Sequence, residues 1–368
     1  MRVAFYAPLK PPGHLIPSGD RHIARLFLAA LRRAGHQPFV ASRLRSFDGD
    51  GDTRHQAQIA ALGRRTAERL VRHWRQNPDG GPQVWFTYHL YYKAPDWLGP
   101  AVSAALGIPY VIAEASYAAK RAGGPWASGH RAVEQTLRQA DAVIGLNSTD
   151  RDGVLPLLRD SRRWFALPPF LDAAAYPVRP ARSPEMPRLI AAAMMRPGDK
   201  LASYQVLGKA LAKLLDLPWS LEIVGDGPAR GEVEHALMPL GSRVIYRGAL
   251  DQKAVVEALA RADLCVWPAV NEAFGMALLE AQASGLPVVA GASGVVGDIV
   301  VPELTGLLAP AGDAEAFATA VRRLIADPAA RTAMGLAAQQ KVRREHDLPI
   351  AATRLAGLID SLGRRRAA

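Results

Sequence analysis

A double alternation of short apolar runs with helical patterns constrains the fold more than any other feature of this sequence. In the first half, the runs that predict buried strands are residues 3–7, 37–41, 84–88, 110–113, 142–146 and 164–167. In the second half they are residues 188–193, 220–224, 243–246, 264–267 and 287–290. Strands that alternate with helices in this way form parallel sheets joined by crossover helices. The chain is therefore predicted to be an α/β protein with two successive doubly wound, Rossmann-like units.

Proline marks the expected junction between these units. Residues 176–187 are rich in proline and poor in apolar side chains, which is typical of a linker. We therefore expect an N-terminal domain over residues 1–175 and a C-terminal domain over residues 188–349, with a C-terminal helix at 350–368 that completes the first domain. Ligands of doubly wound sheets bind at the carboxyl ends of the strands, so two facing units predict a central cleft.

Two features predict the compartment. No apolar run approaches the roughly 20 residues that a membrane-spanning helix needs, and residues 1–7 have none of the marks of a secretory signal. The single cysteine, Cys265, lies in an apolar run and has no partner for an internal disulfide. These features favour a reducing compartment. We expect a cytoplasmic protein, and attachment to the inner face of the membrane is an open alternative.

The net charge of +11 is concentrated in the first half, where residues 1–175 carry 23 Lys and Arg against 14 Asp and Glu. A basic surface attracts nucleic acid, anionic lipid or phosphorylated substrates. The sequence has no zinc-finger spacing, aromatic RNA-binding consensus or basic leucine zipper, so we expect no nucleic-acid partner.

A basic helix is predicted at residues 56–74, where one face carries the apolar residues Ile59, Leu62, Leu70 and Trp74. A solvated face is the preferred interpretation of the opposite, basic side. Contact with an anionic membrane surface is the alternative. The arginines concerned are Arg64, Arg65, Arg69, Arg72 and Arg75.

The segment at residues 271–290 carries the clearest chemistry. Glu272 lies in the loop after a predicted strand, and a helix begins near Gly275, so that Glu280 lies inside that helix. Unpaired N–H groups at a helix start favour a phosphate, and a glycine there lets the phosphate approach closely. Taken alone, two such glutamates are more often a carboxylate that balances the helix dipole and a solvated surface group.

With its surroundings, this segment resembles the Glu-x7-Glu motif of the retaining glycosyltransferases of family 4 (glycosyltransferases group 1). The similarity extends over most of the chain in the right order, through residues 32–36, 140–144, 222–228, 262–268, 284–289 and 304–308. The resemblance implies a GT-B fold that holds a nucleotide-sugar donor mainly in the C-terminal domain and an acceptor in the N-terminal one.

The resemblance also implies roles for single residues. Glu280 would bind the ribose hydroxyls of a UDP- or GDP-linked sugar, and Glu272 would contact the donor sugar. Backbone N–H groups near the helix start would face the diphosphate, namely those of Phe274, Gly275, Met276 and Ala277.

Two further segments of the second half are candidates for the donor site. Arg196 and Lys200 resemble the basic pair that stabilises the charge on the leaving phosphate. Gly225 and Asp226 either line the donor pocket or only make a turn and a helix cap, and the residues favour neither interpretation.

The first half departs from the family pattern in two places. Where the family has a glycine-rich turn near the donor phosphate, this chain keeps only Gly19, and Arg21 either supplies charge or is a surface residue. Where many members have a histidine near the reaction centre, this chain has Ala115. Either a neighbour such as His89, Glu114 or Ser116 takes that role, or turnover is unusual, and a structural role explains His89 equally well.

Some motifs have competing explanations. The aspartates of residues 48–52 suggest a metal loop, but an EF-hand would need glutamate where Ile59 stands. A flexible loop is preferred, and no metal is expected. Most tryptophans of the first half are expected in the core, whereas Trp97 and Trp126 are candidates to stack on an acceptor sugar.

The function that these features favour is a metal-independent retaining hexosyltransferase. It would move a hexose from a nucleotide-diphospho-sugar to a glycan, lipid-linked or phosphorylated acceptor, in the synthesis of a cell-surface polysaccharide or glycolipid, and it would need no cofactor. The alternatives are a GT-B epimerase or phosphorylase, and a nucleotide-sugar-binding protein that has lost turnover, which the alanine at position 115 suggests.

Overall fold

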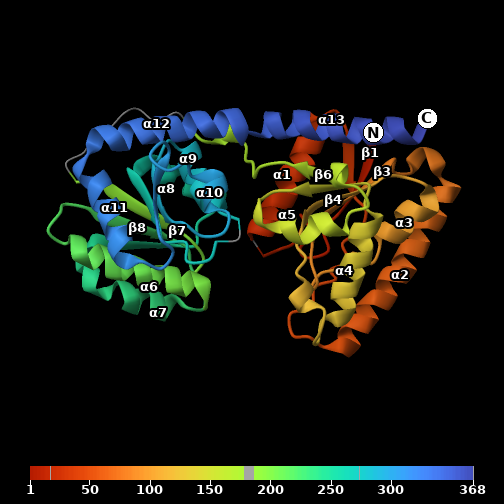
Figure 1. Ribbon diagram of the computed structural model, residues 1–368, viewed down its shortest axis with the longest axis horizontal. Helices are drawn as coiled ribbons and strands as arrows, with labels where there is room; N and C mark the ends of the chain where they lie inside the picture. Colours follow the sequence, from red (N-terminus) through yellow and green to blue (C-terminus); the bar gives the residue numbers. More distant parts are fainter. Residues whose placement is uncertain (17, 178–185, 273, 368) are drawn as a thin grey trace. The chain divides into compact units, whose positions relative to one another are not determined.

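The computed structural model describes residues 1–16, 18–177, 186–272 and 274–367. The chain forms two compact units, unit 1 with residues 1–168 and 348–368 and unit 2 with residues 169–347. Each unit is built around a six-stranded sheet in which every pair of neighbouring strands is parallel (Figure 1). The predicted α/β class with two doubly wound units is confirmed.

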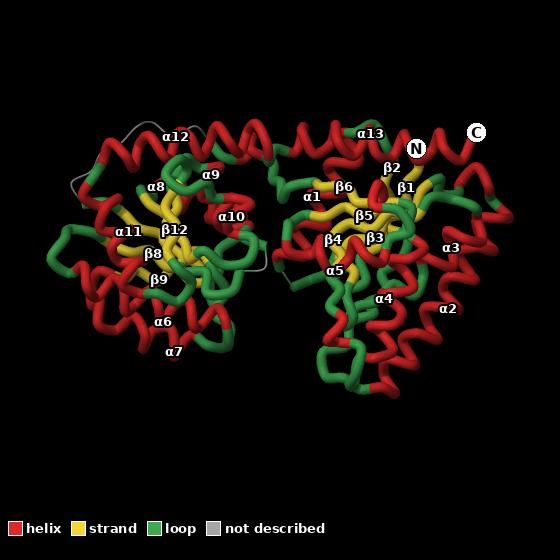
Figure 2. Tube along the Cα trace, in the orientation of Figure 1, coloured by secondary structure: helices red, strands yellow, loops and turns green. Residues whose placement is uncertain are grey.

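The sheet of unit 1 has the strand order β2-β1-β3-β4-β5-β6. Its strands are β1 (Arg2–Tyr6), β2 (Gln37–Val40), β3 (Val84–Leu90), β4 (Tyr110–Ala115), β5 (Ala142–Gly145) and β6 (Trp164–Ala166). Its helices are α1 (Gly19–Arg33), α2 (Thr53–Gln76), α3 (Gly99–Leu106), α4 (Ala127–Gln139), α5 (Thr149–Val154) and α13 (Leu348–Ala367). Helix α13 packs against α1, and α2 packs against α3 (Figure 2).

The sheet of unit 2 has the order β12-β11-β10-β7-β8-β9. Its strands are β7 (Arg188–Ala192), β8 (Ser220–Val224), β9 (Val244–Gly248), β10 (Leu264–Trp267), β11 (Val288–Gly291) and β12 (Gly306–Ala309). Its helices are α6 (Asp199–Leu211), α7 (Arg230–Leu237), α8 (Gln252–Arg261), α9 (Met276–Ala283), α10 (Val296–Ile299), α11 (Ala314–Ala326) and α12 (Pro328–Glu345). Helix α6 packs against α7 and α11, and α9 packs against α8 and α12.

Each sheet has one point at which its winding reverses. In unit 1, β1 lies between β2 and β3, and in unit 2, β7 lies between β8 and β10. The chain leaves β1 toward β2 but leaves β3 toward β4, so the loops after β1 and β3 diverge and open a crevice at the carboxyl ends of these strands. The loops after β7 and β10 do the same in unit 2. These two places are called switch point 1 and switch point 2 below.

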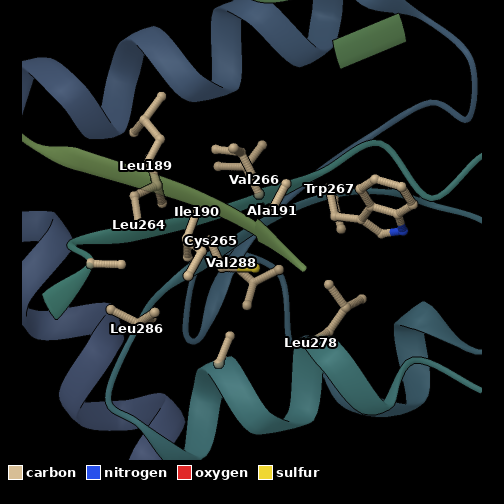
Figure 3. Packing of buried hydrophobic residues seen from close by; sticks show 14 of the residues in the cluster. Leu189, Ile190, Ala191, Leu264, Cys265, Val266, Trp267, Leu278, Leu286 and Val288 are labelled. Carbon is tan, nitrogen blue, oxygen red and sulfur yellow. The ribbon is translucent and has the colours of Figure 1, made fainter. Parts of the chain in front are cut away.

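The core of unit 2 holds switch point 2 in place. Side chains of β7, β10 and β11 pack against Leu278 of α9 and against Leu286, while Trp267 stands at the carboxyl end of β10 (Figure 3). Cys265 is buried in this core, and burial raises the pKa of its thiol to about 12. A thiol that stays protonated at neutral pH is inert, so Cys265 serves as a small apolar side chain.

Every strand that the sequence predicts is present, and the structure adds β12, which was not predicted. One prediction about the basic helix was wrong, since Leu62 is 44% exposed. Gly63 takes its place on the buried face of α2, because the side chain of Trp97 packs directly over this glycine.

The boundaries of the units differ from those expected. Unit 1 ends at Pro168 rather than at residue 175, because Leu171 bonds to the carbonyl of His346 and Ala173 lies in the core of unit 2. The expected linker falls mostly on residues 178–185, which lie outside the described residues. No helix in the described part of the chain combines the length and the apolar character that crossing a bilayer requires.

Candidate functional site

Switch point 2 joins a lysine to a glutamate. Lys200 lies in the first turn of α6, after β7, and Glu272 lies in the loop after β10. The Lys200 Nζ donates to Glu272 Oε2 at 2.6 Å, and this ammonium also lies over the Trp267 ring, 5.4 Å from its centroid. The side chains are 28% and 12% exposed, so the pair is only partly covered. An ammonium has three N–H donors, so Lys200 can keep Glu272 and still bind an anion.

The carboxylate of Glu272 is fixed by its own loop. Trp267 Nε1 donates to Oε2 at 3.1 Å, and the backbone N–H of Gly275 donates to Oε1 at 3.4 Å. The backbone N–H of Glu272 donates to the Ser293 hydroxyl at 3.3 Å, and that hydroxyl in turn donates to the Ala269 carbonyl. Ala269 has a φ of 47°, a conformation that non-glycine residues rarely adopt and that recurs at functional sites.

Helix α9 begins where the sequence predicts. Gly275 has a φ of 68°, and a Cβ there would lie 2.6 Å from the Cδ1 of Ile299, so this turn needs a glycine. Met276 and Ala277 occupy the first turn, where a helix has no internal acceptors for its N–H groups. Phe274 precedes them and is half-buried. The turn therefore offers N–H groups to an anion beside the ammonium of Lys200.

Glu280, further along α9, is held by two polar side chains. The Tyr176 hydroxyl donates to Glu280 Oε1 at 3.1 Å, and Gln252 Nε2 donates to the same oxygen at 3.0 Å. Burial, and next the charge of Glu280, raise the pKa of the Tyr176 phenol well above its ordinary value, so Tyr176 stays a donor. The second oxygen, Oε2, has no hydrogen bond among the described residues. Such an oriented carboxylate is suited to accept hydrogen bonds from a diol.

The remaining candidates of unit 2 play different parts. Gly225 has a φ of 138°, and a Cβ there would lie 2.0 Å from the Ala193 carbonyl, so the turn after β8 packs tightly against the end of β7. The side chain of Asp226 accepts from the backbone N–H of Gly227 and from Arg230, which are turn and helix-start contacts. Arg196 is exposed, and its side chain has no ion pair in the described part of unit 2.

Switch point 1 joins a histidine to two carboxylates. Asp20 lies in the first turn of α1, after β1, and His89 and Glu114 lie near the carboxyl ends of β3 and β4. The Nδ1 of His89 is 3.0 Å from Asp20 Oδ1 and 3.6 Å from Glu114 Oε1. The other oxygen of Glu114, Oε2, is buried and has no hydrogen-bond partner among the described residues.

The charges of this cluster set its protonation. Burial lowers the pKa of His89, but the charge of Glu114 and the hydrogen bond and charge of Asp20 outweigh it and raise that pKa to about 9. Burial raises the pKa of Glu114 to about 7, against the opposing charge of His89. Burial also raises the pKa of Asp20, but the hydrogen bond and charge of His89 lower it below its ordinary value. His89 is therefore a cation at neutral pH, and its Nε2–H is a hydrogen-bond donor.

Backbone strain accompanies this cluster. His89 and Glu114 have φ values of 61° and 58°, in the left-handed region that glycine favours. Each such residue costs about 1–3 kcal/mol, and such strain concentrates at active sites and ligand clamps. The fold of unit 1 thus maintains the position of both side chains at the expense of local stability.

The other candidates of unit 1 lie outside the cluster. Gly19 has an ordinary φ, and no heavy atom lies within 4 Å of the place that a Cβ would take, so nothing in the fold requires glycine there. Arg21 donates to the carbonyls of His14 and Leu15 and so braces the loop after β1. Ser116 is exposed and bonds through its backbone N–H to Leu90.

The two tryptophans differ from each other. Trp97 packs over Gly63 of α2 and is part of the packing between helix and loop. The hollow that it lines together with Trp126 has a volume of about 10 Å³, enough for at most one water and not for a sugar. Trp126 donates from Nε1 to the Asp48 carbonyl at 3.0 Å, and its ring remains half-buried.

The aspartate segment at residues 48–52 makes a hydrogen-bonded turn. Asp48 is buried, and its Oδ2 accepts from the backbone N–H of Gly51 and from Gln56. Asp52 caps α2 by accepting from the N–H groups of Arg54 and His55. Within the described ranges, no group of three or more His, Cys, Asp or Glu side chains has the arrangement of a metal site.

Sequence reasoning missed several residues that complete these two sites. Asp20, Tyr176, Gln252 and Trp267 contact a predicted site residue, and none of them was predicted to belong to the site, although Trp267 lies in the segment 262–268 that resembles the family. Asp20 also carried a signal, since it is an acidic residue in the first turn of the helix that follows the first strand.

Comparison with known proteins places this geometry in context. Residues 186–327 match the model of the family described as Glycosyl transferases group 1. The chain is 32% identical over 157 residues to the sulfoquinovosyl transferase SQD2 of Arabidopsis thaliana, which covers 42% of this chain and 30% of that protein. It is 29% identical over 278 residues to a glycogen synthase of Mycobacterium tuberculosis, which covers 71% of this chain and 66% of that one.

A third relative is the GDP-mannose-dependent monoacylated alpha-(1-6)-phosphatidylinositol monomannoside mannosyltransferase of Corynebacterium glutamicum. It is 32% identical over 148 residues, which are 38% of this chain and 39% of the relative. The matches to SQD2 and to this mannosyltransferase therefore cover well under half of those proteins.

Solved structures resemble the whole chain in fold. Sucrose-phosphate synthase from Thermosynechococcus elongatus has a TM-score of 0.74 at 20% identity, with 99% of both chains covered. HepE from Anabaena, in complex with UDP and glucose, has a TM-score of 0.72 at 16% identity, with 97% of this chain and 99% of that chain covered. The prediction of a GT-B fold is confirmed by these neighbours.

Proposed function

We propose that this chain, which belongs to the family of group 1 glycosyltransferases, transfers a hexose from a nucleotide-diphospho-sugar to an acceptor hydroxyl with retention of configuration. The observation that carries the proposal is the arrangement at switch point 2. There the ammonium of Lys200, on α6, meets a segment that carries Glu272, the start of α9 and the oriented carboxylate of Glu280. A nucleotide diphosphate with its sugar needs this set of groups, namely cationic and N–H donors for phosphate and carboxylates for hydroxyls.

Each group has a proposed part in donor binding. The N–H groups of Phe274, Met276 and Ala277 face the diphosphate, while Gly275 lets it approach closely and keeps its own N–H on Glu272. Lys200 donates to the same diphosphate while it keeps its bond to Glu272, and the exposed Arg196 can reach it as a second cation. Glu280 accepts hydrogen bonds from the ribose, and Glu272 accepts them from the sugar.

The chemistry needs no protein nucleophile. The bond between the anomeric carbon and the diphosphate oxygen breaks, and its electron pair goes to the diphosphate. Fixed cations and helix N–H groups stabilise the charge that develops on the leaving group. The acceptor oxygen bonds to the anomeric carbon from the face that the diphosphate leaves, and the acceptor proton passes to the departing diphosphate. The products are a glycoside and a nucleoside diphosphate.

Switch point 1 supplies the acceptor side in this proposal. His89 is cationic at neutral pH, so it donates a hydrogen bond from Nε2 rather than removing a proton. Glu114 offers its unpaired Oε2 to a sugar hydroxyl. Asp20 is a positioning residue, because it fixes Nδ1 of His89 and so leaves Nε2 as the donor.

The donor assignment is tested by thermal shift with UDP, GDP, ADP and their sugars. A ligand at a hundredfold excess over its Kd stabilises the native state by about 2.7 kcal/mol. We expect a uridine or guanosine diphosphate to raise the Tm of the wild-type protein and of the control Glu257→Ala, which alters an exposed glutamate of α8. Glu280→Ala should abolish the shift. If no nucleotide shifts the wild type at millimolar concentration, the donor site is assigned wrongly.

Attachment to an anionic membrane is the proposed location. The arginines of α2 at positions 64, 65, 69 and 72 are all exposed, and so is Leu62. Basic residues near an anionic surface contribute roughly 1 kcal/mol each. We expect co-sedimentation with phosphatidylglycerol vesicles at low salt, little with phosphatidylcholine vesicles, and loss of binding when Arg65 and Arg69 become glutamate. Equal binding of the charge-reversed protein would contradict this location.

A further inference from the structure

Four rings lie in contact along one side of unit 1. The ring centroids of His89 and Tyr91 are 5.2 Å apart, those of Tyr91 and Tyr92 are 5.6 Å apart, and those of Tyr92 and Trp126 are 6.0 Å apart. Three of the rings come from the end of β3 and the turn after it, and Trp126 comes from the residue before α4. We name these four residues the aromatic path.

Cations and a hydrogen bond fix the outer rings. Lys93 Nζ lies 4.2 Å from the centroid of Trp126, and the guanidinium of Arg121 lies 5.7 Å from that of Tyr92. The bond from Trp126 Nε1 to the Asp48 carbonyl sets the indole orientation. Tyr91, Tyr92 and Trp126 are half-buried residues. Oriented, partly exposed rings lose little conformational freedom when a ligand stacks on them.

The inner end of the path is polar. His89 lies beside Asp20 and Glu114, and Glu114 Oε2 is a buried acceptor without a partner in the described part of the chain. A carbohydrate has both kinds of surface, with C–H faces that pack on aromatic rings and hydroxyls that bond to carboxylates. The centroids of neighbouring rings are 5.2 to 6.0 Å apart, and the pairs Tyr91–Tyr92 and Tyr92–Trp126 are edge to face, so each ring presents a face of its own and the path is longer than a monosaccharide needs.

We propose that the aromatic path binds a glycan acceptor of at least two sugar residues, with the reacting residue at His89 and Glu114 and the preceding residue on Tyr92 and Trp126. This rests on the proposed glycosyl transfer. The acceptor is thereby a carbohydrate chain.

The test compares single sugars with their disaccharides. With the nucleotide-sugar that gives the thermal shift, release of nucleoside diphosphate is measured with methyl α-mannoside, methyl α-glucoside, methyl α-1,6-mannobioside and methyl maltoside. We expect the KM of one disaccharide to be about tenfold lower than that of its monosaccharide. Tyr92→Leu and Trp126→Leu should remove that advantage, and should leave the nucleotide thermal shift unchanged. Phe39→Leu, which alters a half-buried ring of β2, should retain the advantage.

The outcomes separate this inference from the proposed function. If no nucleotide stabilises the wild type, the assignment of the donor site is wrong. Saturation-transfer NMR with the same two disaccharides then tests the aromatic path directly. Absence of disaccharide contact with wild type overturns the path. An equal loss of kcat/KM for the monosaccharide and the disaccharide in Tyr92→Leu and Trp126→Leu also overturns it. Transfer only to phosphatidylinositol in mixed vesicles does so as well. Disaccharide contact that is present with the wild type and absent in Tyr92→Leu and Trp126→Leu supports the aromatic path.

Discussion

The two switch points of this molecule place charged residues at equivalent positions but with opposite sign. In unit 1, the helix after the first strand supplies the acid Asp20, which meets His89 from β3 at 3.0 Å. In unit 2, the corresponding helix supplies the base Lys200, which meets Glu272 from the loop after β10 at 2.6 Å. The shared topology determines where such a pair lies, because the loops after these strands meet at the same edge.

The difference in sign indicates a difference in ligand. A lysine beside the start of a helix suits a diphosphate, whereas a carboxylate with a free, buried oxygen suits hydroxyl groups. The turns around the pairs differ as well. Unit 2 uses glycine where its backbone is tight, at Gly225 and Gly275, and strains Ala269 in its loop, whereas unit 1 strains the site residues His89 and Glu114 themselves. In the proposed function, one architecture serves two ligands through the residues at its switch points.

The largest effect is expected at the lysine of switch point 2. Lys200→Ala removes a fixed cation from the leaving diphosphate, so kcat should fall by about 10²–10³-fold, the range found when one such donor is removed. Lys209→Ala, which alters an exposed lysine of the same helix, is the control. Steady-state release of nucleoside diphosphate measures both. A fall of less than about fivefold in Lys200→Ala, close to the effect of one ordinary hydrogen bond, would show that the pair is structural.

A change from glycine to alanine should lower the free energy of unfolding by different amounts in the two units. Gly225→Ala places a Cβ 2.0 Å from the Ala193 carbonyl at a φ of 138° and should destabilise unit 2 by about 3 kcal/mol. Gly19→Ala meets no heavy atom within 4 Å and should change stability by less than about 0.5 kcal/mol. Scanning calorimetry of both variants gives the comparison. Equal Tm values for the two would contradict the tight turn.

The protonation of switch point 1 gives a pH-dependent prediction. Because the folded-state pKa of His89 is raised to about 9, the stability that its cation contributes is fully present below about pH 6.5. It is lost as the pH rises through about 9, and its size is on the order of 1–2 kcal/mol. NMR titration of the imidazole should give a midpoint near 9. Asp20→Asn should lower that midpoint, and an unchanged midpoint would remove Asp20 as a positioning residue.

The smallest effect is expected at the tyrosine behind Glu280. Tyr176→Phe removes the hydroxyl that orients the carboxylate, and the loss of one hydrogen bond should weaken nucleotide binding by about 3–10-fold. Titration calorimetry with the nucleotide found by thermal shift measures the change. Tyr246→Phe, on β9, is the matched control, and an equal loss in both variants would mean that the effect is not specific to Glu280.

The sequence alone determined the fold class and the donor motif. Strand positions follow from short apolar runs, and the placement of Glu272 in a loop and Glu280 in a helix follows from the pattern around Gly275. These are local properties, because apolar periodicity and glycine conformations depend on neighbouring residues. The missing pieces of the fold, β12 and the boundary at Pro168, lacked a strong local pattern.

Only the tertiary structure decided which side chains meet. Asp20 and His89 are 69 residues apart in the chain, Lys200 and Glu272 are 72 apart, and Tyr176 and Glu280 are 104 apart. No local pattern predicts these contacts, nor the position of Trp97, which packs over a glycine of α2. Such contacts depend on how strands are ordered in a sheet and how helices pack on it, and these arrangements are set by the whole core rather than by neighbouring residues.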